Sequence, residues 1–248
     1  MTRPLAERPI DAVLLDIEGT TTPIAFVHDV LFPYARAHLR DWMAAHAPSA
    51  EFSAVFEQLA REHAADHARG TPVPDWDAST VSAAQASIAR YARSLMDEDR
   101  KSPGLKLLQG LIWESGYQAG ELRGLVFADV APALRRWRAA GLRLAVYSSG
   151  SELAQRRLFE STPEGDLTPL FDGFFDTRVG GKKEIDSYRR IVEQLRVAAE
   201  RIVFISDLTA ELNAAEGAGM QVVLSVRDGN AVQPNAEKYE RVLSFDGL

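Results

Sequence analysis

The chain has 248 residues, of which 46% are hydrophobic and 25% charged; this is ordinary for a soluble globular protein and allows a sizeable core. Its net charge of −7 argues against general nucleic-acid binding and against adhesion to anionic membranes. The absence of cysteine excludes disulfides, thiolate zinc sites and thiol catalysis.

The first ten residues lack the apolar core of a signal peptide, and no apolar run reaches membrane-spanning length. We therefore expect a cytoplasmic protein without membrane or nucleic-acid partners. We also expect it to act as a monomer.

The first predicted strand ends in a carboxylate. Four apolar residues, AVLL at 12–15, are typical of a buried parallel strand, and Asp16 follows them directly. Glu18 and Gly19 come next, in a polar stretch too turn-prone to continue the strand. Ligands of open α/β sheets bind beyond the carboxyl ends of the strands, so Asp16 is expected at the mouth of such a crevice. Taken alone, this pattern more often marks only a turn, and the later strand ends decide its meaning.

The pattern from residue 26 to about residue 120 is helical, without a convincing strand. Pro33 should limit or kink the first helix, and Ser102 followed by Pro103 is a strong start signal for the last. Ser79 or Thr80 can cap the third helix. The expected helices cover about 27–47, 51–68, 81–96 and 103–120. This stretch is too long for a connecting loop and predicts a small inserted domain.

The strand-helix alternation resumes near Leu125. Asp129 can cap the next helix, which Gly141 ends. Strands are expected at 142–149, 201–207 and 221–226, and helices at 130–140, 151–161, 185–195 and 209–219. Such alternation predicts an α/β fold with a Rossmann-like parallel sheet and right-handed crossovers. The predicted core is residues 1–25 and 121–248, interrupted by helical residues 26–120.

A second strand, ending at Tyr147, leads into the hydroxyl-rich run Ser148-Ser149-Gly150-Ser151 just before a helix. Hydroxyls and free backbone N–H groups at a helix N-terminus suit a phosphate oxygen. A plain helix cap is compatible with the same residues.

Two further positions complete the pattern. Lys182 follows Gly180-Gly181, where the chain can turn tightly and present an ammonium group, whereas Lys183 is expected to be a solvated surface lysine. The apolar run at 202–205 leads to Ser206 and Asp207, which repeats the strand-then-carboxylate pattern of Asp16.

These positions together predict a chemistry. Two carboxylates from separate strand ends, Asp16 and Asp207, suit Mg²⁺, which prefers oxygen ligands and keeps several waters. A serine hydroxyl and Lys182 complete a cage for a tetrahedral dianion. Asp16 is then placed for in-line attack on phosphorus, which gives an aspartyl-phosphate that water later hydrolyses. Mg²⁺ and Lys182 would neutralise the charge that otherwise keeps this nucleophile away from a phosphate.

The order of Asp16-x-Glu18-Gly-Thr, Ser148, Lys182 and Asp207 resembles the four motifs of the haloacid dehalogenase-like hydrolases. The resemblance becomes closer in longer segments that cover most of the chain. These segments are LLDIEGTTTPIAFVHDVLFPYAR, LQGLIW, FADVAPALRRW, VYSSGSELAQ, LFDGFFDTRVGGK and FISD. They are similar to the enolase-phosphatases of methionine salvage, also called acireductone synthases.

The resemblance implies a bifunctional reaction on a small phosphate ester. In that family 2,3-diketo-5-methylthiopentyl-1-phosphate is enolised and then dephosphorylated to the acireductone. The family's Mg²⁺ sites fall on Asp16, Glu18 and Asp207, and its substrate contacts fall on Ser148, Ser149 and Lys182. It also implies that the helical insertion is a cap domain that closes over the crevice.

Glu18 departs from the wider superfamily, whose phosphatases usually have Asp there as the general acid and base. The resemblance implies a catalytic role for the Glu18 carboxylate, beside a backbone carbonyl given to the metal. Which proton this carboxylate handles is left open by the sequence.

Other functions share parts of this pattern. A haloacid dehalogenase-like phosphatase could act on another small phosphate monoester without an enolase step. A phosphoacceptor signalling domain also combines Asp, Mg²⁺, a hydroxyl and Lys, but it needs no large helical insertion. A dehalogenase would share the Asp16 nucleophile but has no use for a metal pair such as Asp16 and Asp207.

Overall fold

The structure is a computed structural model that describes residues 4–47, 49–100 and 102–248. The chain divides into two compact units. Met1–His28 and Gly120–Leu248 form the first, here called the core unit, and Asp29–Ala119 form the second, the helical unit.

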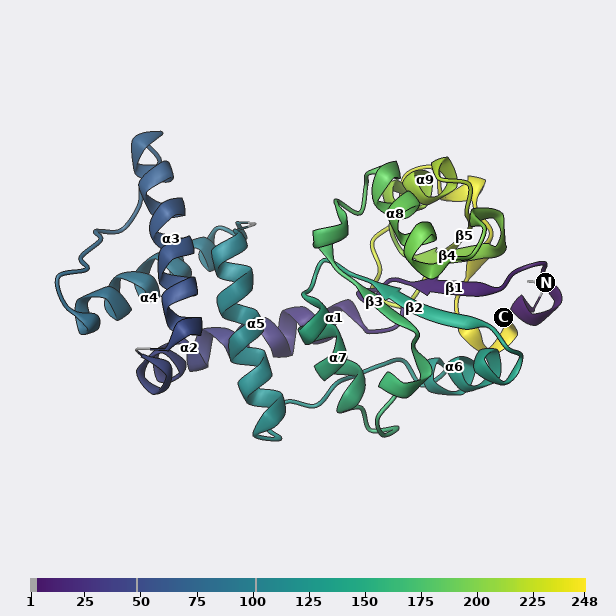
Figure 1. The fold of residues 1–248 in the computed structure, drawn as a ribbon, viewed down its shortest axis with the longest axis horizontal. Coiled ribbons are helices and arrows are strands. Elements are labelled where there is room, and N and C mark those ends of the chain that lie inside the picture. Colours follow the sequence, from purple (N-terminus) through teal and green to yellow (C-terminus); the bar gives the residue numbers. More distant parts are fainter. Residues whose placement is uncertain (1–3, 48, 101) are drawn as a thin grey trace. The chain divides into compact units, whose positions relative to one another are not determined.

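The core unit contains a six-stranded sheet in the order β3-β2-β1-β4-β5-β6, with every neighbouring pair parallel. Helices α8 and α9 cover one face of this sheet, and α6 and α7 lie on the other (Figure 1). The strands are Ala12–Leu15, Arg143–Tyr147, Gly173–Phe175, Ile202–Ser206, Gln221–Ser225 and Arg241–Val242. The helices of the unit are α1 Ile24–Phe26, α6 Val130–Ala139, α7 Glu152–Glu160, α8 Ile185–Leu195 and α9 Thr209–Gly217. The predicted α/β fold with a parallel sheet is confirmed.

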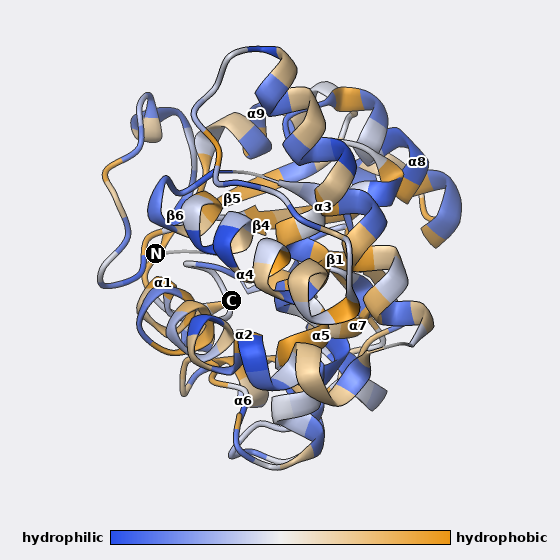
Figure 2. Ribbon diagram, turned by 90° about the vertical axis from the view of Figure 1, so that its left-hand side faces the viewer, coloured by the Kyte–Doolittle hydropathy of each residue, from blue (hydrophilic) through white to orange (hydrophobic). Residues whose placement is uncertain are grey.

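The central strands are buried on both faces, which explains their continuous apolar sequences. Figure 2 shows β4 and β5 coloured mostly as hydrophobic. The sequence patterns did not predict β3 and β6, because strands of three and two residues are too short to show a periodic signal.

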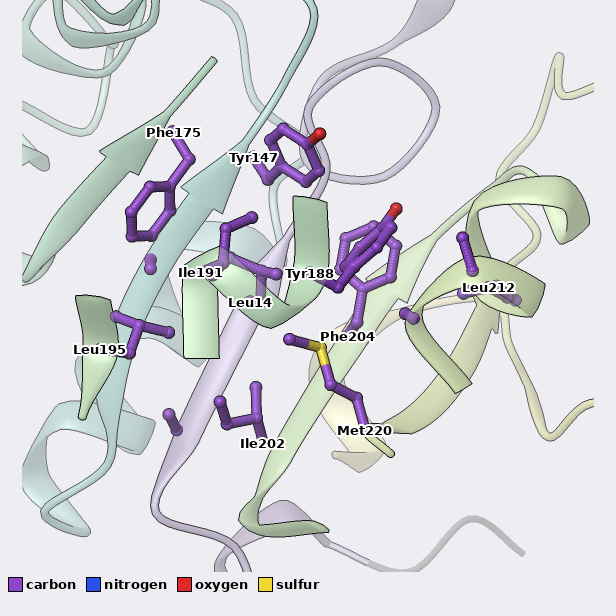
Figure 3. Close-up of a cluster of buried hydrophobic side chains, with 14 of the residues drawn as sticks. Leu14, Tyr147, Phe175, Tyr188, Ile191, Leu195, Ile202, Phe204, Leu212 and Met220 are labelled. Carbon is purple, nitrogen blue, oxygen red and sulfur yellow. The ribbon is translucent and has the colours of Figure 1, made fainter. Parts of the chain in front are cut away.

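One layer of the core lies between the sheet and helices α8 and α9 (Figure 3). Leu14 from β1 and Phe204 from β4 meet Tyr188 and Ile191 from α8 and Leu212 from α9. Side chains alternate along a strand, so Leu14 points to this layer while Leu15 points to the opposite face. The layer ties α8 and α9, the helices that follow the Lys182 loop and Asp207, to the central strands.

The helical unit contains α2 Phe32–His46, α3 Ala50–Ala68, α4 Val81–Asp97 and α5 Pro103–Gln118, around a separate apolar core. Pro33 does not break the first helix: a π-helical turn at Val27–Leu31 leads into α2, and Pro33 lies in the first turn. The hydroxyl of Thr80, rather than Ser79, caps α4 by accepting from the Ala83 N–H. No helix in the described parts of the chain is long and apolar enough to cross a membrane.

A buried carboxylate, Asp66 in α3, stabilises the helical unit. It accepts hydrogen bonds from the Tyr91 hydroxyl at 2.6 Å and from Arg100 Nη1 at 2.6 Å, and it pairs with Arg69. The hydrogen bonds from Arg100 are the largest cause that holds the pKa of Asp66 well below its usual range. The folded unit therefore favours the ionised form of Asp66.

We expect Asp66→Asn to lower the free energy of unfolding by about 2 kcal/mol at neutral pH, because it weakens charge-assisted hydrogen bonds. A carboxyl whose pKa is depressed on folding contributes stability above its unfolded pKa and loses it as the pH falls. The difference from wild type should thus shrink between about pH 5 and pH 2. Urea titrations monitored by circular dichroism measure the free energy of unfolding of each variant. Asp41 is exposed, so Asp41→Asn is the matched control. Equal losses in the two variants would contradict the assignment.

Candidate active site

The sheet register brings the predicted strand ends together. Leu15 is level with Val146 on β2 and with Ile205 on β4. Asp16 therefore leaves the sheet beside Tyr147 on one side and Ser206 on the other. Ser148 and Asp207 each follow one residue later, so the carboxyl ends of three adjacent strands form one site.

Asp16 lies in a buried network of charges. Lys182 Nζ is 2.5 Å from Asp16 Oδ1 and 2.7 Å from Glu211 Oε2, and the side chains of all three residues are almost fully buried. The Ser206 hydroxyl donates to Glu211 at 2.9 Å. Burial alone would lower the pKa of the Lys182 ammonium, but the two carboxylates outweigh it and raise this pKa. Lys182 is therefore a permanent cation next to Asp16.

Glu211 was not among the site residues predicted from the sequence. It lies in the first turn of α9, four residues after Asp207. An acidic residue in the first turn of the helix after a carboxylate-bearing strand was the available signal, but a favourable helix-dipole position explains such a residue equally well.

Two tyrosines of the core layer hold the loop that carries Lys182. The Tyr147 hydroxyl donates to the Gly180 carbonyl at 2.9 Å, and the Tyr188 hydroxyl donates to the Lys182 carbonyl at 2.7 Å. Figure 3 shows both phenol oxygens at the same end of the apolar cluster. The backbone of Lys182 is thus fixed to the core, and its side chain is directed to Asp16.

Negative charge dominates the site. Burial, followed by the carboxylates of Asp16 and Glu211, raises the pKa of Asp207 to about 7. Burial and the Asp16 carboxylate raise the pKa of Glu211 as well. Three buried carboxylates thus face the ammonium of Lys182, and an added cation would favour their ionised forms.

The donor set of this site fits Mg²⁺. Asp16 and Asp207 offer carboxylate oxygens from neighbouring strands, as Mg²⁺ prefers. In the described part of the chain, no group of three or more His, Cys, Asp or Glu side chains is placed to hold a metal. Two carboxylates, here Asp16 and Asp207, are a number that Mg²⁺ usually takes from a protein, because it keeps several waters.

The loop after Asp16 is closely packed at Gly19. Its φ of +69° lies in the left-handed region, and a Cβ there would stand 2.6 Å from Asp207 Oδ2 and 2.8 Å from Asn230 Oδ1. Only glycine combines this backbone with this approach. The Gly19 carbonyl accepts from Asn230 Nδ2 at 2.9 Å and from the Ser225 hydroxyl at 3.1 Å.

A buried arginine holds the next residue of the same loop. Arg227 donates from Nε to the Thr20 carbonyl at 3.2 Å, and its Nη1 pairs with Asp129 at 2.8 Å. The expected capping role of Asp129 is therefore wrong, because its side chain makes no bond to the start of α6. It accepts instead from Arg227 and, at 2.6 Å, from the Phe245 N–H. The buried guanidinium is a charged donor, and it attracts this carboxylate more strongly than neutral backbone N–H groups do.

The hydroxyl residues after β2 differ in exposure. Ser148 is buried, and its hydroxyl accepts from the Gly150 N–H at 3.2 Å, whereas Ser149 is exposed. Ser151 caps α7 by accepting from the Ala154 N–H at 3.2 Å. Gln155 fixes this turn with a hydrogen bond from its Nε2 to the Gly150 carbonyl at 2.8 Å.

The structure thus brings Asp16 and Lys182 into direct contact and places Asp207 close enough to affect the same charges. Glu18 is exposed on the loop beyond Asp16 and adds a smaller contribution to the raised pKa of Asp207. Ser148 follows the neighbouring strand end, one residue beyond the level of Asp16.

We expect Lys182→Ala to lower kcat/KM for phosphate release by on the order of ten- to a hundredfold, about 1.5–3 kcal/mol, because it removes the charge-assisted contact expected between the ammonium and the phosphate. Lys183 is exposed and gives a matched control one residue away, so Lys183→Ala should do little. Steady-state phosphate release measures both variants. Equal effects of the two substitutions would mean that the Lys182 ammonium does not contribute to phosphate release.

Comparison with known proteins places this chain in a family. A family model described as haloacid dehalogenase-like hydrolase matches residues 10–219. Enolase-phosphatase E1 of Synechococcus elongatus is 48% identical over 96% of this chain and 98% of its own length. Enolase-phosphatase E1 of Gluconacetobacter diazotrophicus is 50% identical over 88% of this chain and 84% of its own length.

Solved structures agree with this relation. The UTR4 protein of Saccharomyces cerevisiae is 32% identical and has a TM-score of 0.75, with 96% of this chain and all of that chain covered. CbbY from Rhodobacter sphaeroides, in complex with phosphate, is 22% identical with a TM-score of 0.57 over 95% of each chain, a likeness of fold alone. The chain therefore belongs to the haloacid dehalogenase-like hydrolases and, within them, to the enolase-phosphatase family.

Proposed function

We propose that the protein is an enolase-phosphatase of methionine salvage. It converts 2,3-diketo-5-methylthiopentyl-1-phosphate to the acireductone 1,2-dihydroxy-3-keto-5-methylthiopentene and phosphate. The observation that carries the chemistry is the buried ion pair of Asp16 with Lys182 at 2.5 Å, which pairs a nucleophile with a cation for phosphate. The identity to enolase-phosphatases over most of the chain supports the substrate.

In the phosphatase step, an Asp16 carboxylate oxygen attacks phosphorus, the bond from phosphorus to the substrate oxygen breaks, and an aspartyl-phosphate forms. Water then attacks this phosphorus and releases phosphate, which regenerates the Asp16 carboxylate. Lys182 offsets the negative charge of the phosphate, and Glu211 directs the ammonium into the site. Ser148, Ser149 and the backbone N–H groups after β2 bind phosphate oxygens.

We propose that Mg²⁺ is held by the carboxylates of Asp16 and Asp207 and by the backbone carbonyl of Glu18. Bound there, it supplies positive charge to the phosphate and to an enolate oxygen. The Glu18 carboxylate acts as a general acid and base for a proton of the substrate or of water. Its exposure on the loop next to Asp16 is consistent with a group that exchanges protons with bound substrate.

The helical unit is proposed to be the cap domain that the family resemblance implies, with the predicted boundaries at residues 26 and 120. Such a domain would exclude water during enolisation. The expectation of a cytoplasmic monomer without nucleic-acid or membrane partners rests on the sequence alone.

The test is incubation with the diketo-phosphate and Mg²⁺, with phosphate release and the ultraviolet absorbance of the acireductone followed together. Equal amounts of both products are expected. Phosphate without the absorbance would instead indicate a phosphatase for other small esters, and a phosphorylated protein stable for minutes or hours would indicate a signalling domain. A control without enzyme corrects for spontaneous enolisation.

A further inference from the structure

The loop after β5 approaches the proposed metal site through a side chain that the sequence motifs did not include. Asn230 Nδ2 donates to the Gly19 carbonyl at 2.9 Å and is 3.4 Å from the Ser225 carbonyl. Both contacts are acceptors, so they identify this end of the side chain as the amide nitrogen. The carbonyl oxygen Oδ1 must therefore point in the other direction.

That other direction leads to Asp207. The position that a Cβ of Gly19 would occupy is 2.8 Å from Asn230 Oδ1 and 2.6 Å from Asp207 Oδ2. Two side-chain oxygens from different loops thus both approach the place where Gly19 has no side chain. Gly19 itself keeps this approach open, because any larger residue would strike both oxygens.

When Asp207 is ionised, as a metal ligand must be, these two oxygens can share a partner. An amide oxygen and an ionised carboxylate are both acceptors and cannot hydrogen-bond to each other. A proton donor that both can share would stabilise them, and a water molecule bound to Mg²⁺ has that chemistry. Groups that orient metal ligands in this way typically change metal affinity by about 10–100-fold.

We propose that Asn230 is a positioning residue of the Mg²⁺ site. Its Nδ2 fixes the carbonyl of Gly19 and hence the loop that follows Asp16, while its Oδ1 orients the Asp207 carboxylate through a shared water. The inference rests on the proposed function in so far as that function needs Mg²⁺. It assigns a role in metal binding to the loop after β5, beyond the four motifs.

The experiment is a calorimetric titration of the full-length, substrate-free protein with MgCl₂. Asn230→Ala should weaken the Kd for Mg²⁺ by about 10–100-fold. Ser225→Ala removes the other side-chain donor to the Gly19 carbonyl without touching Asp207, and we expect at most about a threefold change. The Asn213→Ala variant is a control for loss of an asparagine side chain elsewhere in the core unit. It loses the hydrogen bond from the Tyr239 hydroxyl to Asn213 and should bind Mg²⁺ like wild type.

Turnover gives a second measurement. Because Asn230 does not touch the reacting atoms, kcat of Asn230→Ala should recover to within about threefold of wild type at saturating Mg²⁺, which a collapsed site would not allow. Unfolding temperatures in chelator show that the variants are folded. If Asn230→Ala does not fold, Asn230→Ser, which keeps a hydroxyl but is too short to reach Asp207, replaces it with the same expectation.

Three results would overturn the proposal. They are a Kd of Asn230→Ala within twofold of wild type, an equal loss in Ser225→Ala, and no Mg²⁺ binding by the wild type. A failure of the proposed reaction looks different, because the titration contains no substrate. A protein whose Mg²⁺ affinity depends on Asn230 but that releases no acireductone would keep the inference and refute the function.

Discussion

Asp16→Asn is expected to stop phosphate release almost completely, by at least about 10⁴-fold, because the amide cannot form the covalent phospho-intermediate. The side chain keeps its size and can still accept a hydrogen bond from Lys182, so the fold should persist. Phosphate release from the diketo-phosphate measures the loss.

The same variant separates the two half-reactions. Enolisation needs a base at the C1 proton and a positive group at the developing enolate oxygen, neither of which has to be the nucleophile. Asp16→Asn is therefore expected to exchange the C1 proton of unreacted substrate in heavy water. Proton NMR of recovered substrate measures deuterium at C1, and substrate without enzyme gives the background rate.

Exchange above background without phosphate release would show that enolisation precedes phosphoryl transfer. The variant must also be shown to bind Mg²⁺ and substrate, because Asp16 is a proposed metal ligand. A variant that binds both normally and exchanges nothing would contradict separable steps.

Asp207→Asn is expected to lower kcat/KM by on the order of a thousandfold, about 4 kcal/mol, because it removes a proposed Mg²⁺ ligand while keeping the shape of the side chain. Chelation should abolish turnover of the wild type, and added Mg²⁺ should restore it. Full activity in excess chelator would rule out the metal assignment.

The same substitution should stabilise the metal-free protein above about pH 7. Folding raises the pKa of Asp207 from 3.8 to about 7, first through burial and then through the carboxylates of Asp16 and Glu211. A raised carboxyl pKa means that stability is lost as the pH rises through this range, once the folded protein must hold the buried charge. Asn has no such charge, so the difference in free energy of unfolding between Asp207→Asn and wild type should disappear near pH 4. Urea unfolding in the presence of chelator, above pH 7 and near pH 4, measures this difference.

The sequence was sufficient to predict which residues lie at the carboxyl ends of the central strands. Asp16 and Asp207 were predicted because each of them ends an apolar run. The carboxyl ends of parallel strands all lie at the same edge of the sheet, so the two carboxylates are expected there. Lys182 was predicted from the glycines before it, and its contact with Asp16 agrees with that interpretation.

The contacts of Asn230 and Arg227 could not be predicted, because they depend on where loops far apart in the sequence meet. Asn230 reaches Gly19 across 211 positions, and Arg227 reaches Thr20 across 207. No local spacing encodes such a meeting. Asp129 shows the reverse error: its local pattern indicated a helix cap, but a buried guanidinium from the loop after β5 binds it instead.

The division of the chain into units has a consequence for synthesis on the ribosome. Residues 29–119 form a continuous segment, so the helical unit can fold as soon as it has emerged. Strand β1 emerges earlier, yet its partner β2 starts at Arg143 and its other partner β4 at Ile202. At about 5–20 residues per second, the apolar segment 12–15 waits roughly 10–40 s for β4. During that interval the segment just before Asp16 stays without its strand partner β4, and it is a binding site for a chaperone that recognises short apolar segments.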